Sequence, residues 1–198
     1  ITFHGVSKLY SANSVGLLDI NLTVNAGEFV SIVVQSGVGK STLIKLLIAE
    51  ERPTRGVIEI GGWDITKIPS RDIPYLRRQI GVIFQDFKLL PKRTVFENVA
   101  FALEVAGAKS SRINHVVPQV LDIVGLSQKE RRYPHQLSGG EQQRVVIARS
   151  LVHTPKIMVA DEPTGNLDSI NTAEIVEIFK KINEFGTTMV LVTHNREV

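Results

Sequence analysis

The sequence lacks cysteine, long apolar runs and any large excess of charge of one sign. Without cysteine it has no disulfide framework, no thiolate nucleophile and no Cys-based zinc site. Its richest apolar window, residues 95–106, is broken by Glu97, Asn98 and Glu104 and falls short of the roughly 18 apolar residues of a membrane span. The net charge is only +3, whereas a dedicated nucleic-acid binder carries a clustered excess of basic residues. We therefore expect a globular protein without a nucleic-acid partner.

The apolar residues that are present predict alternating strands and helices. Strands buried on both faces of a parallel sheet are predicted over residues 29–34, 156–160 and 188–192. Helical spacing predicts helices over residues 41–50, 141–152 and 172–185. Residues 57–60 alternate and predict an antiparallel strand, and residues 94–129 read as mostly helical, with Gly107 and Pro118 among the breaks between short helices.

These elements predict an α/β fold, with a mainly parallel sheet core, an antiparallel β subdomain and an inserted helical subdomain. We expect one domain over residues 1–198. Residues 1–90 and 137–198 would form the α/β core with its β subdomain, and about residues 91–136 would form the helical subdomain.

A glycine-rich segment between a predicted strand and a predicted helix has the chemistry of a phosphate-binding loop. Its glycines let backbone N–H groups face an anion, Lys40 can reach the β- and γ-phosphates of a nucleotide, and Ser41 can offer a hydroxyl to Mg²⁺. The full pattern asks for another glycine where this chain has Val34. Because a β-branched residue avoids positive φ, we expect the strand to run one residue further instead.

Polar residues follow the second and third buried strands. Beside a phosphate loop, Asp161 is the natural partner of Mg²⁺, held through water, and Glu162 is the candidate base that orients and deprotonates the attacking water. Taken alone, the two acids could equally be the polar end of a capped strand. His194 lies where an open α/β sheet places ligand residues, although a lone histidine at a strand end is usually structural.

The segment Leu137–Arg144, LSGGEQQR, supplies a second glycine-rich helix start. It resembles the signature sequence of ATP-binding cassette (ABC) ATPases, and the resemblance extends over essentially the whole chain. The resemblance implies an enzyme that hydrolyses ATP to ADP and phosphate with Mg²⁺. It also implies that Tyr10 stacks on adenine, that Gln85 senses Mg²⁺ and the partner subunit, that Asp168 belongs to the D-loop and that His194 contacts the γ-phosphate.

The predicted site combines the residues read from the motifs with those implied by the resemblance. The ATP-binding residues would be Tyr10, Ser36, Gly37, Val38, Gly39, Lys40, Ser41, Thr42, Gln85, Ser138, Gly139, Gly140, Asp161 and Asp168. The Mg²⁺ ligands would be Ser41, Gln85 and Asp161, and the catalytic residues would be Glu162 and His194.

The resemblance also implies partners. Family members form homodimers on ATP binding and attach to an integral membrane protein of the permease type, which would place this chain on the inner face of the cell membrane. Residues 75–90 and 93–100 resemble the cell-division branch, which controls peptidoglycan hydrolases indirectly; the alternative is the lipoprotein-release or macrolide-export branch. Phe87, Leu89 and Leu90 would anchor the membrane partner unless they pack inside the helical subdomain. Because the family continues past His194, we expect its C-terminal strand and helix to be absent from these 198 residues.

Two other classes are less consistent with the sequence. An ABC ATPase that acts on DNA or ribosomes would need a long coiled coil, for which the segment between Pro91 and Gln136 is too short. A nucleotide-dependent regulator that does not hydrolyse ATP is suggested only by Val34.

Overall fold

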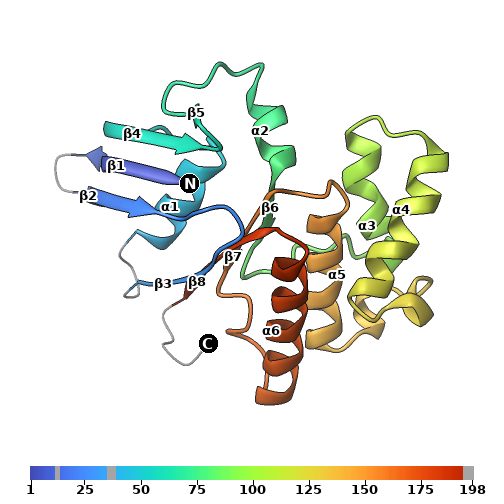
Figure 1. Ribbon diagram of the computed structural model, residues 1–198. Coiled ribbons are helices and arrows are strands. Elements are labelled where there is room, and N and C mark those ends of the chain that lie inside the picture. The colour runs from blue at the N-terminus through green and yellow to red at the C-terminus, as the bar shows by residue number, and fades with distance from the viewer. Residues whose placement is uncertain (12–13, 35–38, 194–198) are drawn as a thin grey trace.

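The computed structural model describes residues 1–11, 14–34 and 39–193, which form two four-stranded sheets and the helices around them (Figure 1). One sheet is entirely parallel, in the order β3-β8-β7-β6. Its strands are β3 (Phe29–Val33), β6 (Ile80–Ile83), β7 (Ile157–Asp161) and β8 (Thr188–Thr193). The three predicted buried strands are therefore confirmed to within one or two residues, and β6 is a strand that the sequence did not reveal.

The expectation for Val34 is met in its hydrogen bonding, although the strand is one residue shorter than predicted. Strand β3 ends at Val33, but the Val34 N–H still donates to the Thr193 carbonyl oxygen at 3.0 Å. Val34 is not among the described non-glycine residues with positive φ. The chain therefore continues the parallel ladder at the position where the full phosphate-loop pattern has a glycine.

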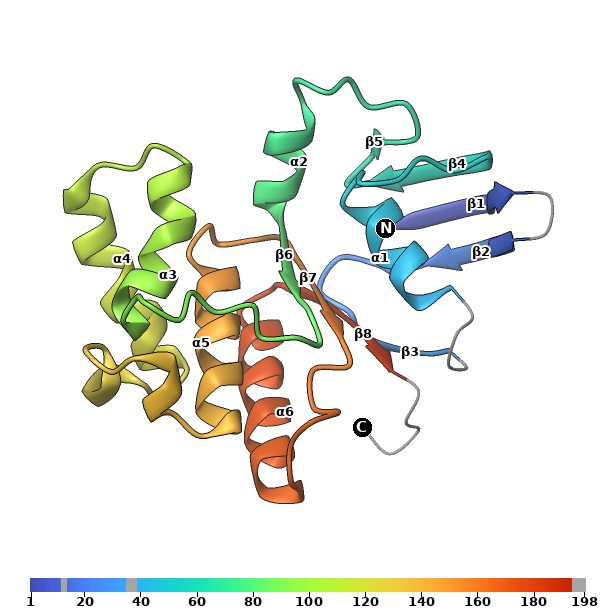
Figure 2. The ribbon, with the colours of Figure 1, turned by 180° about the vertical axis from the view of Figure 1, so that it is seen from behind.

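The parallel sheet is buried on both faces. Met158 and Met189 point into one apolar cluster, which contains side chains of α5 (Gly139–Leu151) and α6 (Ser169–Glu184). Val159 and Val190 point into a second cluster, which contains side chains of α1 (Lys40–Leu47) and of the other sheet. Seen from behind, α1 lies against the antiparallel sheet, on the opposite side of the parallel sheet from α5 and α6 (Figure 2). The sheet is thus a central layer, and packing on both of its faces holds the ends of its strands in place.

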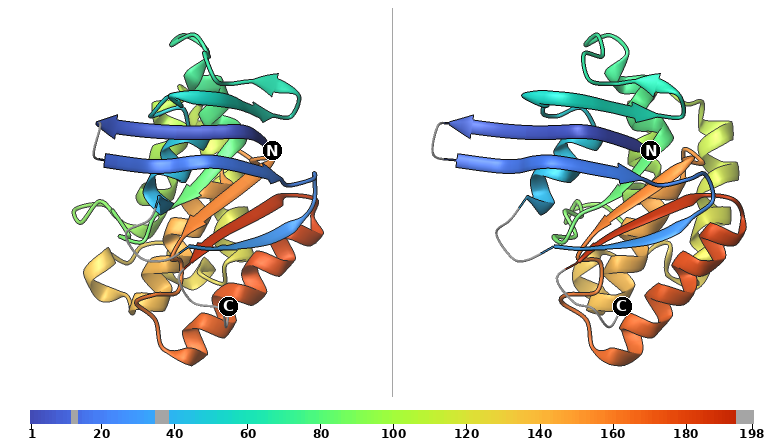
Figure 3. Two further views of the ribbon diagram at one scale, coloured as in Figure 1. Left: turned by 90° about the vertical axis from the view of Figure 1, so that its left-hand side faces the viewer. Right: turned by 60° about the vertical axis from the view of Figure 1, so that its left-hand side comes forward.

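The second sheet is antiparallel, in the order β2-β1-β4-β5, and forms a separate layer (Figure 3). Its strands are β1 (Thr2–Ser11), β2 (Ser14–Thr23), β4 (Arg55–Ile60) and β5 (Trp63–Asp64). The predicted strand at residues 57–60 is confirmed as part of β4. The hairpin of β1 and β2 was not predicted, because repeated register shifts in its pairing interrupt the alternation of buried and exposed residues.

Between β5 and β7 the chain is mainly helical, apart from β6. It forms α2 (Ile73–Gln79), α3 (Val95–Val105), α4 (Ser110–Ile123) and the 3₁₀ turns η1 (Ser127–Lys129) and η2 (Pro134–Gln136). The prediction that Pro118 separates two helices is wrong, because Pro118 lies inside α4. Proline has no N–H to donate to the Asn114 carbonyl oxygen, and both Pro118 and Asn114 are exposed residues.

Helices α3 and α4 share one apolar cluster with α5, α6 and the parallel sheet. The boundary of a helical subdomain at about residues 91 and 136 therefore stays a prediction. Within the described part of the chain, none of the helices has the length and hydrophobicity needed to cross a membrane.

Candidate functional site

The carboxyl ends of the parallel strands bring the predicted site residues to one edge of the sheet. Gln85 follows β6, Asp161 ends β7, Thr193 ends β8, and Lys40 begins the helix after β3. Parallel strands place such residues together because all their carboxyl ends lie at the same edge. Residues distant in the sequence therefore converge on a single region.

A cleft of about 280 Å³ opens at this edge and is lined by Ser41, Gln85 and Asp161. The rest of its lining comes from Ile44, Lys45, Glu50, Phe84, Asp86 and Lys88. All three predicted Mg²⁺ ligands thus share one cleft, although they come from α1, from β7 and from the segment after β6. Hydroxyl, amide and carboxylate oxygens are the hard donors that Mg²⁺ accepts, usually with several water molecules retained.

The electrostatics of Asp161 suit a cation. Its half-buried position raises the pKa of the carboxyl group by desolvation; Lys40 opposes this shift and Glu162 adds to it. A carboxylate that burial disfavours gains from a cation that replaces its lost hydration. Among the residues described, no three or more His, Cys, Asp or Glu side chains cluster as a metal site. The oxygen donors that Ser41, Gln85 and Asp161 bring to the cleft are of mixed type.

Glu162 is held in a strained and buried position beside this cleft. Its backbone adopts φ +46°, and its residue is only 5% exposed. One carboxylate oxygen pairs with the Lys40 ammonium, and the other accepts a hydrogen bond from the Thr193 hydroxyl at 3.1 Å. A non-glycine residue in the left-handed region costs of order 1–3 kcal/mol, and such strain is concentrated at functional sites. The fold thus fixes the direction of this carboxylate.

The start of α1 shows why glycine is needed in the phosphate loop. Gly39 has φ +81°, and a Cβ atom there would lie 2.5 Å from the Gly16 carbonyl oxygen. Tyr10 lies beside this turn, with its hydroxyl 3.2 Å from the Thr42 hydroxyl and its ring about half exposed. Tyr10 and Thr42 are therefore placed next to the proposed phosphate site. The predicted residues Ser36, Gly37, Val38 and His194 lie outside the described residues.

The predicted signature residues form a second helix start, away from the cleft. The Ser138 hydroxyl accepts a hydrogen bond from the Glu141 N–H at 3.3 Å, and the Glu141 carboxylate accepts one from the Ser138 N–H at 2.9 Å. A side-chain hydrogen bond from Lys129 is the main cause that lowers the pKa of Glu141. Ser138 and Gly139 are exposed, and a Cβ atom on Gly140 would overlap the amide of Asn171.

Asp168 is likewise at a helix start. Its carboxylate accepts a hydrogen bond from the Asn171 N–H at 2.8 Å and caps α6, and hydrogen bonds from Asn171 lower its pKa. Of the described residues that line the cleft, none belongs to residues 138–140 or is Asp168. A single chain therefore does not bring the predicted signature and D-loop residues to the cleft.

Sequence reasoning missed some contacts and left others open. It did not predict the contact of Lys40 with Glu162 or the hydrogen bond from Thr193, because both join residues more than 30 positions apart. The only available signal was the position of Thr193 at the end of a predicted strand. Phe87 and Leu89 are half buried against the cluster that contains α3 and α5, which favours the alternative that they pack inside the molecule.

Comparisons with known proteins agree with the resemblance. The family described as ABC transporter matches residues 17–165. The chain is 54% identical over 193 residues to the cell division ATP-binding protein FtsE of Bacillus subtilis, a match that covers 98% of the chain and 85% of that relative. It is 47% identical over 195 residues to the protein of the same name from Escherichia coli, covering 98% of the chain and 88% of the relative.

A solved structure supports the fold. A dimeric ATP-binding cassette in a post-hydrolysis state, bound to ADP and Pi, matches with a TM-score of 0.86 and 35% identity. The match covers 98% of this chain and 88% of that chain. The predicted fold class, a parallel core with an antiparallel sheet and helices, is confirmed.

Proposed function

The chain belongs to the ABC transporter family of ATP-binding proteins, and on that premise we propose that it is the ATPase subunit of a cell-division complex, like the FtsE proteins that it resembles. As an ABC ATPase it binds ATP and hydrolyses it to ADP and phosphate. The observation that carries the proposal is the cleft that gathers Ser41, Gln85 and Asp161 beside the pair of Lys40 and Glu162.

The start of α1 would bind the phosphates. The first N–H groups of a helix have no partner within the helix, and together with the helix dipole they attract an anion. Lys40 stands in the first turn and adds a positive charge. Tyr10, half exposed and in contact with Thr42, would stack on the adenine ring.

Hydrolysis would depend on an exchange of partners at Glu162. An incoming phosphate competes with Glu162 for the Lys40 ammonium, and Glu162 then exchanges that contact for the attacking water, whose proton it accepts. Thr193 holds the other carboxylate oxygen and so keeps the base aimed. Ser41, Gln85 and Asp161 would hold Mg²⁺, which neutralises the charge on the phosphate oxygens when bound. His194, the residue after Thr193, would contact the γ-phosphate.

A second copy of the chain would complete each site. Ser138 and Gly139 form an exposed helix start, followed by the buried Gly140, and none of the three lines the cleft in the described chain; the same holds for Asp168. A solved relative is dimeric. We propose that ATP, held by the α1 start of one copy, also contacts residues 138–140 of the other, so that two ATP molecules bridge a homodimer.

The cell-division assignment rests on the relatives named FtsE from several bacteria. We propose an FtsX-like permease as the integral membrane partner, which would hold the chain at the inner face of the cell membrane. Conformational change driven by ATP turnover would then control peptidoglycan hydrolases indirectly, with no solute transported and no nucleic acid bound.

The test is to isolate the chain with its membrane partner, identify that partner and measure ATP hydrolysis with Mg²⁺ and with EDTA. We expect an FtsX-like permease and turnover that requires Mg²⁺. Recovery of a lipoprotein-release permease would contradict the cell-division assignment and leave the chemistry intact. Turnover that persists in EDTA would contradict the role of Ser41, Gln85 and Asp161.

A further inference from the structure

The segment that carries Gln85 leaves the end of β6 through the cleft and then runs to α3. Residues 84–90 have no helical or strand structure of their own. Phe84, Gln85, Asp86 and Lys88 all line the cleft. The position of the Gln85 amide therefore depends on what fixes this segment to the rest of the molecule.

Arg149, in the last turn of α5, provides one attachment. Its guanidinium donates to the Phe87 carbonyl oxygen at 3.1 Å and to the Lys88 carbonyl oxygen at 2.9 Å. Burial of the guanidinium lowers the pKa of Arg149, so this charge is kept partly out of water to make backbone contacts. The planar fork of arginine can bridge two neighbouring carbonyl groups, whereas the point charge of lysine has no such fixed geometry.

The backbone at this attachment has an unusual shape. Lys88 adopts φ +46°, a conformation that a non-glycine residue takes only when its surroundings hold it there. Its ammonium group stacks over the Phe84 ring, 4.3 Å from the centroid, which closes the segment on itself. The contacts of Arg149 and this cation–π pair thus hold a strained turn two residues after Asp86.

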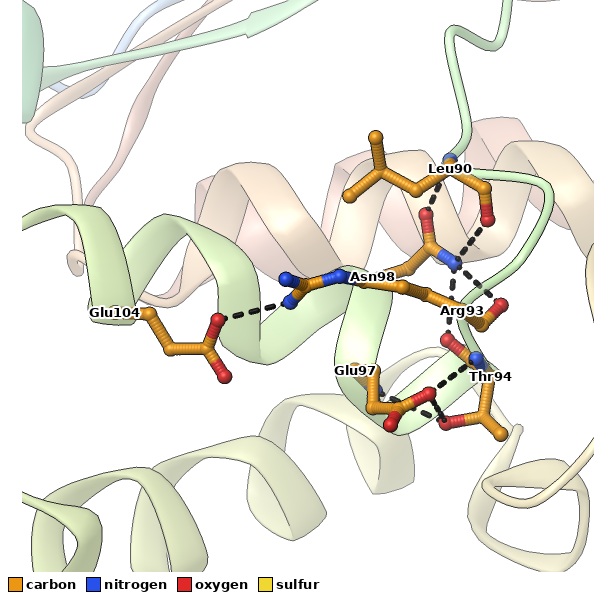
Figure 4. Close-up of polar contacts among 6 residues, drawn as sticks. All are labelled: Leu90, Arg93, Thr94, Glu97, Asn98 and Glu104. Carbon is orange, nitrogen blue, oxygen red and sulfur yellow. Dashed lines mark hydrogen bonds and ion pairs between the residues drawn. The ribbon is translucent and has the colours of Figure 1, made fainter.

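Asn98, a buried residue of α3, provides the second attachment (Figure 4). Its side-chain oxygen accepts from the Leu90 N–H at 2.7 Å. Its amide nitrogen donates to the carbonyl oxygens of Leu90, Arg93 and Thr94 at 3.1, 2.9 and 2.9 Å. The far end of the segment is therefore fixed to α3, and only the part between Gln85 and Lys88 depends on Arg149.

We propose that Arg149 is a positioning residue that sets the Gln85 side of the cleft relative to α5. This inference rests on the proposed function, since it takes the cleft as the site of Mg²⁺ and nucleotide. Arg149 acts through the backbone of Phe87 and Lys88 and touches neither ligand. Because Ser138 caps the start of α5, the same rigid helix carries the exposed signature start at one end and the attachment of the Gln85 segment near the other.

The first test measures the affinity of the full chain for a fluorescent ATP analogue, with Mg²⁺ and with EDTA. The variants are Arg149→Lys, Gln85→Ala and the double variant. We expect Arg149→Lys to reduce the enhancement of affinity by Mg²⁺ about tenfold, the lower end of the effect of removing a group that orients a metal ligand. The double variant should behave like Gln85→Ala alone, because Arg149 acts through the Gln85 segment.

The matched control is Arg52→Lys. Arg52 also donates to a backbone carbonyl oxygen, that of Ile68 at 3.0 Å, but it lies outside the segment of residues 84–90 and outside the lining of the cleft. Arg52→Lys should leave the enhancement by Mg²⁺ unchanged. An Arg149→Lys variant with the wild-type enhancement would overturn the proposal. If Arg149→Lys does not fold, Arg149→Met, which keeps an unbranched stem and removes the donors, repeats the test.

The second test is amide hydrogen exchange without nucleotide. Faster exchange in residues 84–90 of Arg149→Lys, with the exchange of α5 unchanged, supports positioning; faster exchange throughout α5, with residues 84–90 unchanged, overturns it. This readout also separates the two proposals. If the wild-type chain binds the analogue equally with Mg²⁺ and with EDTA, the metal assignment of the proposed function is wrong, and the exchange of residues 84–90 alone decides the role of Arg149.

Discussion

At the scale of single residues, Asp161 shows a conflict between stability and function. Burial raises its pKa in the folded protein, so the folded state keeps the proton at a pH where the unfolded chain has lost it. The loss of folding stability is therefore absent below the pKa of Asp161 in the unfolded chain, about 3.9, and grows as the pH rises through its pKa in the folded protein. In the proposed site, a bound Mg²⁺ would offset this cost, because the same half-buried carboxylate would be one of its ligands.

We predict that Asp161→Asn raises the melting temperature of the ligand-free protein at pH 7 while abolishing the effect of Mg²⁺ on nucleotide affinity. The rise should be at most about 2–4 °C, the shift that about 1 kcal/mol produces in a domain of this size. The difference should shrink as the pH falls toward 4. Thermal melts of both proteins over this pH range check the prediction, and a variant that is less stable at pH 7 would contradict it.

Val34 offers a second test at a single position. Because the Val34 N–H continues the parallel ladder to Thr193, the fold does not use the extra backbone conformations that a glycine at this position could adopt. We predict that Val34→Gly changes ATP affinity by less than tenfold, about 1.4 kcal/mol, and lowers stability by roughly 0.5–1 kcal/mol through chain entropy. Calorimetric titration and urea denaturation measure the two effects. Tighter binding by more than tenfold would show that the loop needs glycine at position 34.

At the scale of elements, the starts of α5 and α6 are packed so closely that a side chain at position 140 would meet the other helix. A Cβ atom on Gly140 would overlap the side-chain amide of Asn171. We predict that Gly140→Ala destabilises the protein by about 1–3 kcal/mol, the usual cost of overpacking. Asn171→Ala removes the overlapping amide, so the double variant should recover most of this loss; urea denaturation of the three variants checks it. If the stability losses of the two single variants simply add in the double variant, the close approach of position 140 to Asn171 would be contradicted.

The Asn98 attachment gives a matched prediction for α3. Asn98→Asp preserves the shape of the side chain but replaces the donor that faces three carbonyl oxygens with an acceptor. We expect a loss of about 3 kcal/mol or more, typical of an unsatisfied charge in a buried network. Protonation of the carboxyl group restores one donor, so the loss should be smaller at pH 4 than at pH 8. A loss independent of pH would point to a packing effect instead.

At the scale of the whole molecule, the parallel core was predictable because its strands are short, apolar and bounded by polar residues. Residues 188–192 illustrate this, since they read as a buried strand and form most of β8. The antiparallel hairpin was not predictable, because the register shifts of β1 remove the period of two. Local pattern also singled out Lys40, Asp161 and Glu162 individually, but the contact of Lys40 with Glu162 depends on the fold, which brings the start of α1 to the end of β7.

The attachment of residues 84–90 could not be predicted for the same reason. In the sequence, Arg149 is an ordinary basic residue in the last turn of a helix, where its positive charge would interact favourably with the helix dipole. Only the packing of α5 beside the end of β6 brings its guanidinium to the carbonyl groups of Phe87 and Lys88. Motifs thus predict the chemistry, whereas the positioning of the motifs requires the structure.

The most direct test of the central claim compares ATP hydrolysis by the intact complex that contains wild-type chain, Glu162→Gln or Glu177→Gln. Glu177 is an exposed glutamate of α6 that pairs with Lys180, so its variant controls for the loss of one charge. With Mg²⁺, we predict that Glu162→Gln lowers kcat by about 100-fold or more, as expected for loss of a general base, and still binds ATP. Glu177→Gln should retain wild-type kcat. A Glu162→Gln complex with wild-type turnover would contradict the assignment of this cleft as the hydrolytic site.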